Sequence, residues 1–89
     1  MSTEEVLSAL LKVSAASEAY EVTSFQVVRH DRLVHVAVLD AGTAAAGERY
    51  TVEVHAPADD SSGEVSLTSN PARTIDEALR GVHWKELDR

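Results

Sequence analysis

The order of hydrophobic and polar residues divides the chain into a helical segment, three alternating segments and a second helical segment. Ser2 and Glu5 have the spacing of a capping box, in which two side chains satisfy free backbone N–H groups at a helix start. Apolar residues then recur at helical spacing and form one stripe: Val6, Leu7, Leu10 and Leu11. We therefore expect a helix that begins after Ser2 and ends near residues 18–20.

The three middle segments alternate between apolar and polar residues, which is the two-residue period of a β-strand. They cover Val22–His30, Leu33–Leu39 and Arg49–Ala56, with a possible fourth strand at Glu64–Ser69. Asp31 and Arg32 are expected to form the turn of the first hairpin, which pairs Phe25 with Val38. The alanine- and glycine-rich loop that follows the second strand contains no feature that fixes its shape.

The end of the chain predicts a second helix, because Thr74 and Glu77 repeat the capping-box spacing ahead of another apolar stripe. Trp84, the only tryptophan, is expected to cover the core after this helix. The predicted fold class is α+β, as a single domain over residues 1–89. It is a two-layer sandwich in which an antiparallel meander of three or four strands packs one face against an N-terminal and a C-terminal helix, in the order α-β-β-β-(β)-α.

Composition narrows the classes of function. Fifteen Asp and Glu against eight Lys and Arg give a net charge of −7, which argues against nucleic acid as a partner because such binding neutralises phosphates with Lys and Arg. The absence of cysteine excludes disulfides, thiolate nucleophiles and thiolate zinc sites. The first residues are acidic and no apolar run is long enough for a membrane span, so we expect a cytoplasmic protein with no membrane partner.

The order of elements resembles that of double-stranded RNA-binding domains, which also run α-β-β-β-α. Those domains carry a lysine-rich cluster at the start of the final helix. In this chain the corresponding segment, Asn70–Glu77, has Arg73 as its only cation and two acids after it. The resemblance therefore concerns topology and implies no RNA-binding function.

If both helices cover one face of the sheet, the other face is uncovered and more apolar than contact with water requires. Contiguous apolar patches of this kind often mark interfaces, whereas isolated apolar residues on a sheet are ordinary. The candidate interaction residues on this face are Val28, His30, Leu33, His35, Ala37, Leu39, Thr51, Glu53 and His55. The leading hypothesis is a non-catalytic module that binds a protein partner or a second copy of itself, since no nucleophile motif such as Gly-x-Ser-x-Gly is present.

A second hypothesis comes from the histidines on the same face. Pairing of Val36 with Val52 would place His35 opposite Glu53, and a His–carboxylate pair can orient a metal ligand or a general base. A small-molecule or metal-binding protein would then use His30, His35, Glu53 and His55. No metal-ligand spacing is present, and we expect no cofactor.

The acidic residues suggest a third hypothesis. The run Asp59–Glu64 holds three carboxylates within six residues, but its spacing differs from that of an EF-hand, so we expect a solvated turn and no calcium site. An acidic inhibitor or immunity-type protein would use this charge to bind a basic partner.

Overall fold

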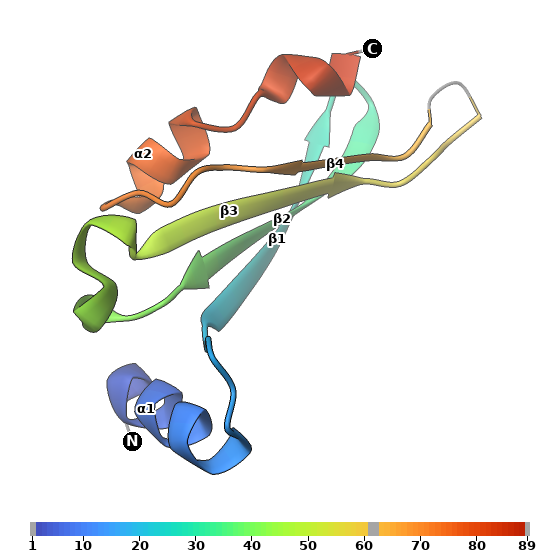
Figure 1. Cartoon of the computed structure of the whole chain (residues 1–89). Helices are drawn as coiled ribbons and strands as arrows, with labels where there is room; N and C mark the ends of the chain where they lie inside the picture. The colour runs from blue at the N-terminus through green and yellow to red at the C-terminus, as the bar shows by residue number, and fades with distance from the viewer. Residues whose placement is uncertain (1, 61–62, 89) are drawn as a thin grey trace.

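The computed structural model describes residues 2–60 and 63–88. In chain order the elements are α1 (Thr3–Ser14), β1 (Glu21–Arg29), β2 (Arg32–Asp40), the 3₁₀ helix η1 (Thr43–Glu48), β3 (Tyr50–Ala56), β4 (Val65–Thr68), α2 (Ile75–Arg80) and the 3₁₀ helix η2 (Trp84–Asp88). The strands form one antiparallel sheet in the order β1-β2-β3-β4 (Figure 1). The predicted α+β class with a meander is confirmed, and the possible fourth strand is present.

The hydrophobic core lies between one face of the sheet and the C-terminal segment. We call this face the inner face. Alternate residues of β2 and β3 are buried on it: Val34, Val36, Val38, Val52, Val54 and Ala56. Ala78, Val82 and Leu87 close the core from the C-terminal segment, and Trp84 packs against it as a partly buried side chain. The predicted role of Trp84 as a cover for the core is confirmed.

The first hairpin turns at His30 and Asp31, one residue earlier than expected. Both residues have positive φ angles, 51° and 62°, in a region that Asp and His enter more readily than most residues. A two-residue turn of this kind matches the twist of the flanking strands. The register therefore shifts by two, and Phe25 lies opposite Val36 instead of Val38. Because a shift of two keeps every side chain on the same face of the sheet, the predicted assignment of the β1 and β2 residues to the two faces is unchanged.

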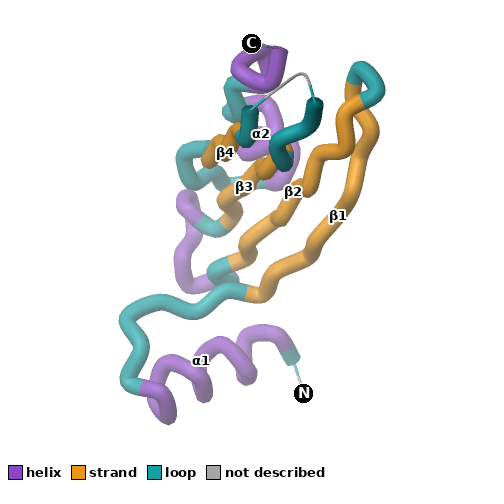
Figure 2. The backbone as a smooth tube through the Cα atoms, turned by 90° about the vertical axis from the view of Figure 1, so that its right-hand side faces the viewer, coloured by secondary structure: helices purple, strands orange, loops and turns teal. Residues whose placement is uncertain are grey.

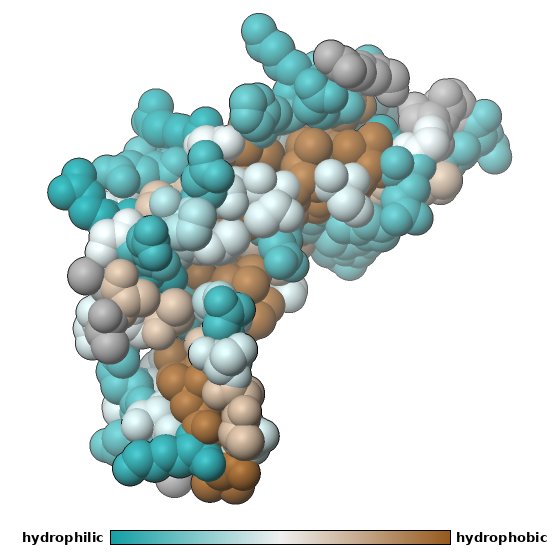
Figure 3. Space-filling model, viewed as in Figure 1, coloured by the Kyte–Doolittle hydropathy of each residue, from teal (hydrophilic) through white to brown (hydrophobic). Residues whose placement is uncertain are grey.

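The N-terminal helix lies beyond the end of the sheet, so the prediction that both helices cover one face was wrong for α1 (Figures 1 and 2). The helix ends early because Ala15 adopts a left-handed conformation, with φ at 56°. Leu7 is buried, while Val6, Leu10 and Leu11 remain between 37% and 47% exposed. Figure 3 shows hydrophobic residues at the surface along α1, in the lower part of the view. The inner face is consequently covered by the C-terminal segment without help from α1.

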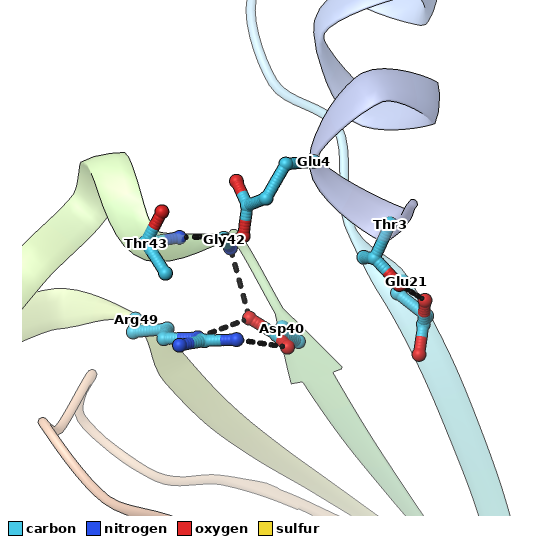
Figure 4. A network of polar contacts seen from close by, with 7 residues as sticks. All are labelled: Thr3, Glu4, Glu21, Asp40, Gly42, Thr43 and Arg49. Atoms are coloured by element: carbon cyan, nitrogen blue, oxygen red, sulfur yellow. Dashed lines mark hydrogen bonds and ion pairs between the residues drawn. The ribbon is translucent and has the colours of Figure 1, made fainter. Parts of the chain in front are cut away.

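The loop after β2 is held by the carboxylate of Asp40, which corrects the expectation that nothing fixes its shape (Figure 4). Asp40 accepts hydrogen bonds from Gly42 N at 2.8 Å and from Arg49 Nε and Nη2 at 2.7 and 3.0 Å. Glu4 of α1 accepts a further bond from Thr43 N at 2.9 Å. Gly42 has a φ of 92°, and a Cβ there would meet Glu4 Oε2 at 2.6 Å. These contacts attach α1 to the end of the sheet.

We expect Asp40→Asn to lower the free energy of unfolding at pH 7 by on the order of 1 kcal/mol, and to lose this effect in acid. Hydrogen bonding by Arg49 is the main reason that the pKa of Asp40 lies below its ordinary value of 3.8. The carboxylate therefore stabilises the fold at pH values above 3.8, and this contribution disappears as the pH falls through the lower folded pKa.

Thermal unfolding of the wild type and of Asp40→Asn, at pH 7 and in strong acid, measures this difference in stability. Asp76→Asn is the matched control, because Asp76 pairs with Arg80 on an exposed helix surface and such pairs contribute about 0.3–0.5 kcal/mol. A deficit of Asp40→Asn that stays constant with pH would show that the charge of the carboxylate is not what holds the loop.

Candidate interaction surface

The face of the sheet opposite the core, which we call the outer face, carries eight of the nine predicted interaction residues. Residues on neighbouring strands form four rows across it: Val28–Leu33, Gln26–His35–His55–Ser66, Ser24–Ala37–Glu53–Thr68 and Val22–Leu39–Thr51. The first and last rows are mainly apolar, and the two middle rows are mainly polar. Val28 and Leu33 are 72% and 44% exposed. The outer face therefore holds two separate apolar patches, at opposite ends of the strands, instead of one contiguous patch.

His30 lies apart from the other predicted residues, because it is the first residue of the hairpin turn. The expectation that it shares the outer face was therefore wrong. It lines a pocket of about 330 Å³ together with Arg29, Asp31, Asp59 and Asp88, among others. Hydrogen bonding by Arg29 lowers the pKa of Asp88. Because Arg29 and the three aspartates all line it, the pocket is lined by charges of both signs.

His35 and His55 are direct neighbours on the outer face. Their ring centroids are 6.2 Å apart and the rings are stacked with an interplanar angle of 18°. Between β2 and β3 the register also differs by two from the expected one, because Val36 pairs with Val54 instead of Val52. His55 therefore lies opposite His35, and the expected pairing of His35 with Glu53 was wrong. Within residues 2–60 and 63–88, no group of three or more His, Cys, Asp or Glu is placed to hold a metal ion.

The acidic turn predicted at Asp59–Glu64 is described in part, since Ser61 and Ser62 lie outside the described residues. Glu64 Oε1 lies 3.3 Å from His55 Nε2. One end of this turn therefore places a carboxylate beside the histidine pair.

A second apolar surface, which the sequence did not predict, lies on the inner face beside β1. Phe25 and Val27 belong to the core side of the sheet but remain 53% and 41% exposed, because α1 does not cover them. Together with Ile75, Leu79 and Trp84 they line a groove of about 470 Å³, which we call the β1 groove. The alternation in β1 assigns these side chains to the inner face correctly. The sequence pattern does not show that α1 leaves these two side chains uncovered.

These observations make β1 the most exposed apolar element of the sheet. Val22 and Val28 are 55% and 72% exposed on the outer face, beside the exposed Phe25 and Val27 of the inner face. Among the described strands, β1 is also an edge strand, hydrogen-bonded to β2 alone (Figure 2). A binding partner can therefore reach β1 from both faces and along its open edge.

Comparisons of the chain with protein-family models, with curated protein sequences and with solved structures found no match. In the described part of the chain, no helix combines the length and the apolar character needed to cross a membrane.

Proposed function

We propose that the protein is a non-catalytic interaction module that binds another protein, or a second copy of itself, through the β1 side of its sheet. The observation that supports this proposal is the exposure of four large apolar side chains on one strand: Val22, Phe25, Val27 and Val28, between 41% and 72%. On the inner face, Phe25 and Val27 are contiguous with the other apolar residues of the β1 groove, and contiguous exposed apolar surface is typical of interaction sites. Covering it contributes about 25 cal/mol for each Å² removed from water.

Two carboxyl groups with a displaced pKa take part in structural contacts with arginines. Among the described residues, the carboxyl groups with a displaced pKa include Asp40 and Asp88, and in both the pKa is lowered by hydrogen bonding from an arginine. A carboxylic acid that donates a proton at neutral pH needs the opposite shift. Both carboxylates instead hold arginines in place, at Arg49 and Arg29.

A cytoplasmic location belongs to the same proposal. The cysteine-free sequence supports it, since the protein does not use the disulfides available in oxidising compartments. Fractionation of the source cells, followed by detection of the protein in the soluble interior fraction, tests this part directly.

The experiment that tests the interaction is capture of binding proteins by the immobilised chain from a lysate of the source cells, compared between wild type and Val28→Asp. Val13→Asp is the matched control, because Val13 is 87% exposed and lies on α1, away from the sheet. We expect wild type and Val13→Asp to retain the same protein, and Val28→Asp to lose it at least about tenfold because a charge is then buried at the contact. Equal recovery by all three proteins, or by none, would contradict the proposal.

A further inference from the structure

The open edge of β1 lacks the features that normally protect an edge strand. The strand is nine residues long and pairs with β2 without a bulge from Glu21 to Arg29. It contains no Pro, Gly or Lys, and its seven central residues are uncharged. Edge strands that must stay unpaired are usually short, charged, bulged or covered. The opposite edge of the sheet, β4, is short, with four residues.

We propose that a second copy of the chain pairs with this edge, β1 against β1 in antiparallel orientation, with Phe25 on the two-fold axis. This inference rests on the proposed function and names its partner. Paired residues of two antiparallel strands point to the same face, so the two inner faces become continuous. The cross-strand pairs are Glu21 with Arg29, Val22 with Val28, Thr23 with Val27, Ser24 with Gln26, and Phe25 with itself.

Each of these pairs joins residues of similar shape, shared polarity or complementary charge, which are the kinds of pair that stabilise neighbouring strands. At both ends of the paired strands, the carboxylate of Glu21 lies opposite the guanidinium of Arg29. On the outer face, Val22 lies opposite Val28, and the polar Ser24 and Gln26 lie opposite each other beside the two-fold axis. In the described chain, Glu21 accepts from Thr3 through Oε2, and Arg29 binds Asp88 through its terminal nitrogens. Glu21 Oε1 and the Nε–H of Arg29 are therefore left for the contact between copies.

Other registers that keep the faces continuous must shift the strands by two residues. A shift in one direction places Val22 opposite Gln26 and Glu21 opposite Val27. A shift in the other direction places Ser24 opposite Val28. Both shifts lose the two contacts between Val22 and Val28 and the pairing of Glu21 with Arg29. The second shift forms one kind of apolar pair, Phe25 with Val27, but leaves Val28 opposite a serine. The register centred on Phe25 is therefore the one that the residues of β1 favour.

This pairing also extends the apolar rows of the outer face. Within one copy, Val22 neighbours Leu39 and Val28 neighbours Leu33. Across the new contact, Val22 of one copy meets Val28 of the other, so that each row runs through Leu39, Val22, Val28 and Leu33. Two separate apolar patches become two continuous rows. On the inner face, the two β1 grooves meet at the Phe25 pair.

Single cysteines test the register, because the chain has none of its own. Ser24 and Gln26 are exposed residues of the outer face, so S24C and Q26C are mild substitutions. In the proposed register, position 24 of one copy lies opposite position 26 of the other. The two introduced cysteines are then within the Cα separation of about 4.4–6.8 Å that a disulfide needs. Two copies of the same variant place their cysteines diagonally, about 7–8 Å apart.

We expect an oxidised equimolar mixture of S24C and Q26C to form a linked dimer at least about tenfold more than either variant alone. Efficient linkage of S24C with itself, or of Q26C with itself, would assign one of the shifted registers and overturn the proposed one. Equal and low linkage in all samples would overturn the pairing.

Sedimentation equilibrium in about 0.15 M salt tests the association without cysteines. We expect a monomer–dimer equilibrium whose Kd rises at least about tenfold in Val28→Asp and stays unchanged in Val13→Asp. A wild-type chain that is monomeric up to about 1 mM would overturn this inference. If the capture experiment then still retained a protein that Val28→Asp loses, the proposed function would stand with a different partner.

Discussion

Replacing Arg32 by methionine is expected to lower the free energy of unfolding by about 2–4 kcal/mol, because three backbone carbonyls lose their donor at once. Arg32 is the first residue of β2, is 9% exposed and points to the core side of the sheet. Its guanidinium donates to the carbonyls of Leu87 at 3.2 Å and Pro57 at 3.3 Å, and to that of Gly63. One side chain thus joins β2 to η2 and to the segment between β3 and β4.

This loss should be a large part of the total free energy of unfolding, since a domain of this size is stable by roughly 5–15 kcal/mol. Urea unfolding followed by Trp84 fluorescence measures it, because Trp84 begins η2 beside the affected carbonyl of Leu87. Arg73→Met is the matched control: Arg73 lies just before α2, its side chain is 74% exposed and it forms a surface pair with Glu77, so its loss should cost less than about 0.5 kcal/mol. Similar midpoints for the two variants would show that the buried guanidinium is not a structural link.

Arg32→Lys separates charge from geometry. A lysine ammonium is compact and lacks the planar fork of donors that reaches several acceptors at once. We expect the lysine variant to recover less than half of the stability that methionine loses, which would be visible as an intermediate urea midpoint. Full recovery would mean that a single positive charge suffices at this position.

The parts of the fold that the sequence predicted are those that depend on neighbouring residues. Both helix starts were correct: Ser2 accepts from Glu5 N at 3.2 Å, and Thr74 accepts from Glu77 N at 3.1 Å. These contacts span three residues, so a short pattern contains all the information. The strands and their faces follow from an alternation that is equally local.

The parts that failed depend on distant contacts. The sequence pattern allows the hairpin to turn at two adjacent positions, and only a folded strand pair distinguishes them. The position of α1 depends on Glu4 reaching Thr43, 39 residues away. A carboxylate such as Asp40 gives no sign in the sequence that it will bind Arg49 and shape a loop.

The same distinction between local patterns and distant contacts applies to the candidate surface. The composition of the outer face was predicted almost completely, with His30 as the exception, because each strand's alternation is local. The grouping of its apolar residues was not predicted, since it depends on which rows the register builds. The β1 groove was missed for the same reason as the position of α1: an apolar helix stripe predicts that something is covered, but not what it covers.

Replacing Trp84 by alanine is expected to cost about 3 kcal/mol, the second large effect in this chain. Trp84 packs against the core as a partly buried residue, and its indole Nε1 donates to the Leu79 carbonyl at 2.9 Å. Alanine removes both the packed area and the hydrogen bond. Trp84→Phe keeps an aromatic ring and removes the bond, and should cost about 1 kcal/mol. Circular dichroism must follow the unfolding, since the chain has no other tryptophan.

The difference between the two Trp84 variants decides what the residue does. A loss of about 3 kcal/mol in alanine and about 1 kcal/mol in phenylalanine means that apolar area holds the C-terminal segment on the sheet. Equal losses would mean that the hydrogen bond to Leu79 dominates. Trp84 also lines the β1 groove, so an alanine variant that stays folded widens the groove next to Phe25. If the self-pairing of β1 depends on backbone and cross-strand contacts, that variant should still dimerise with an unchanged Kd.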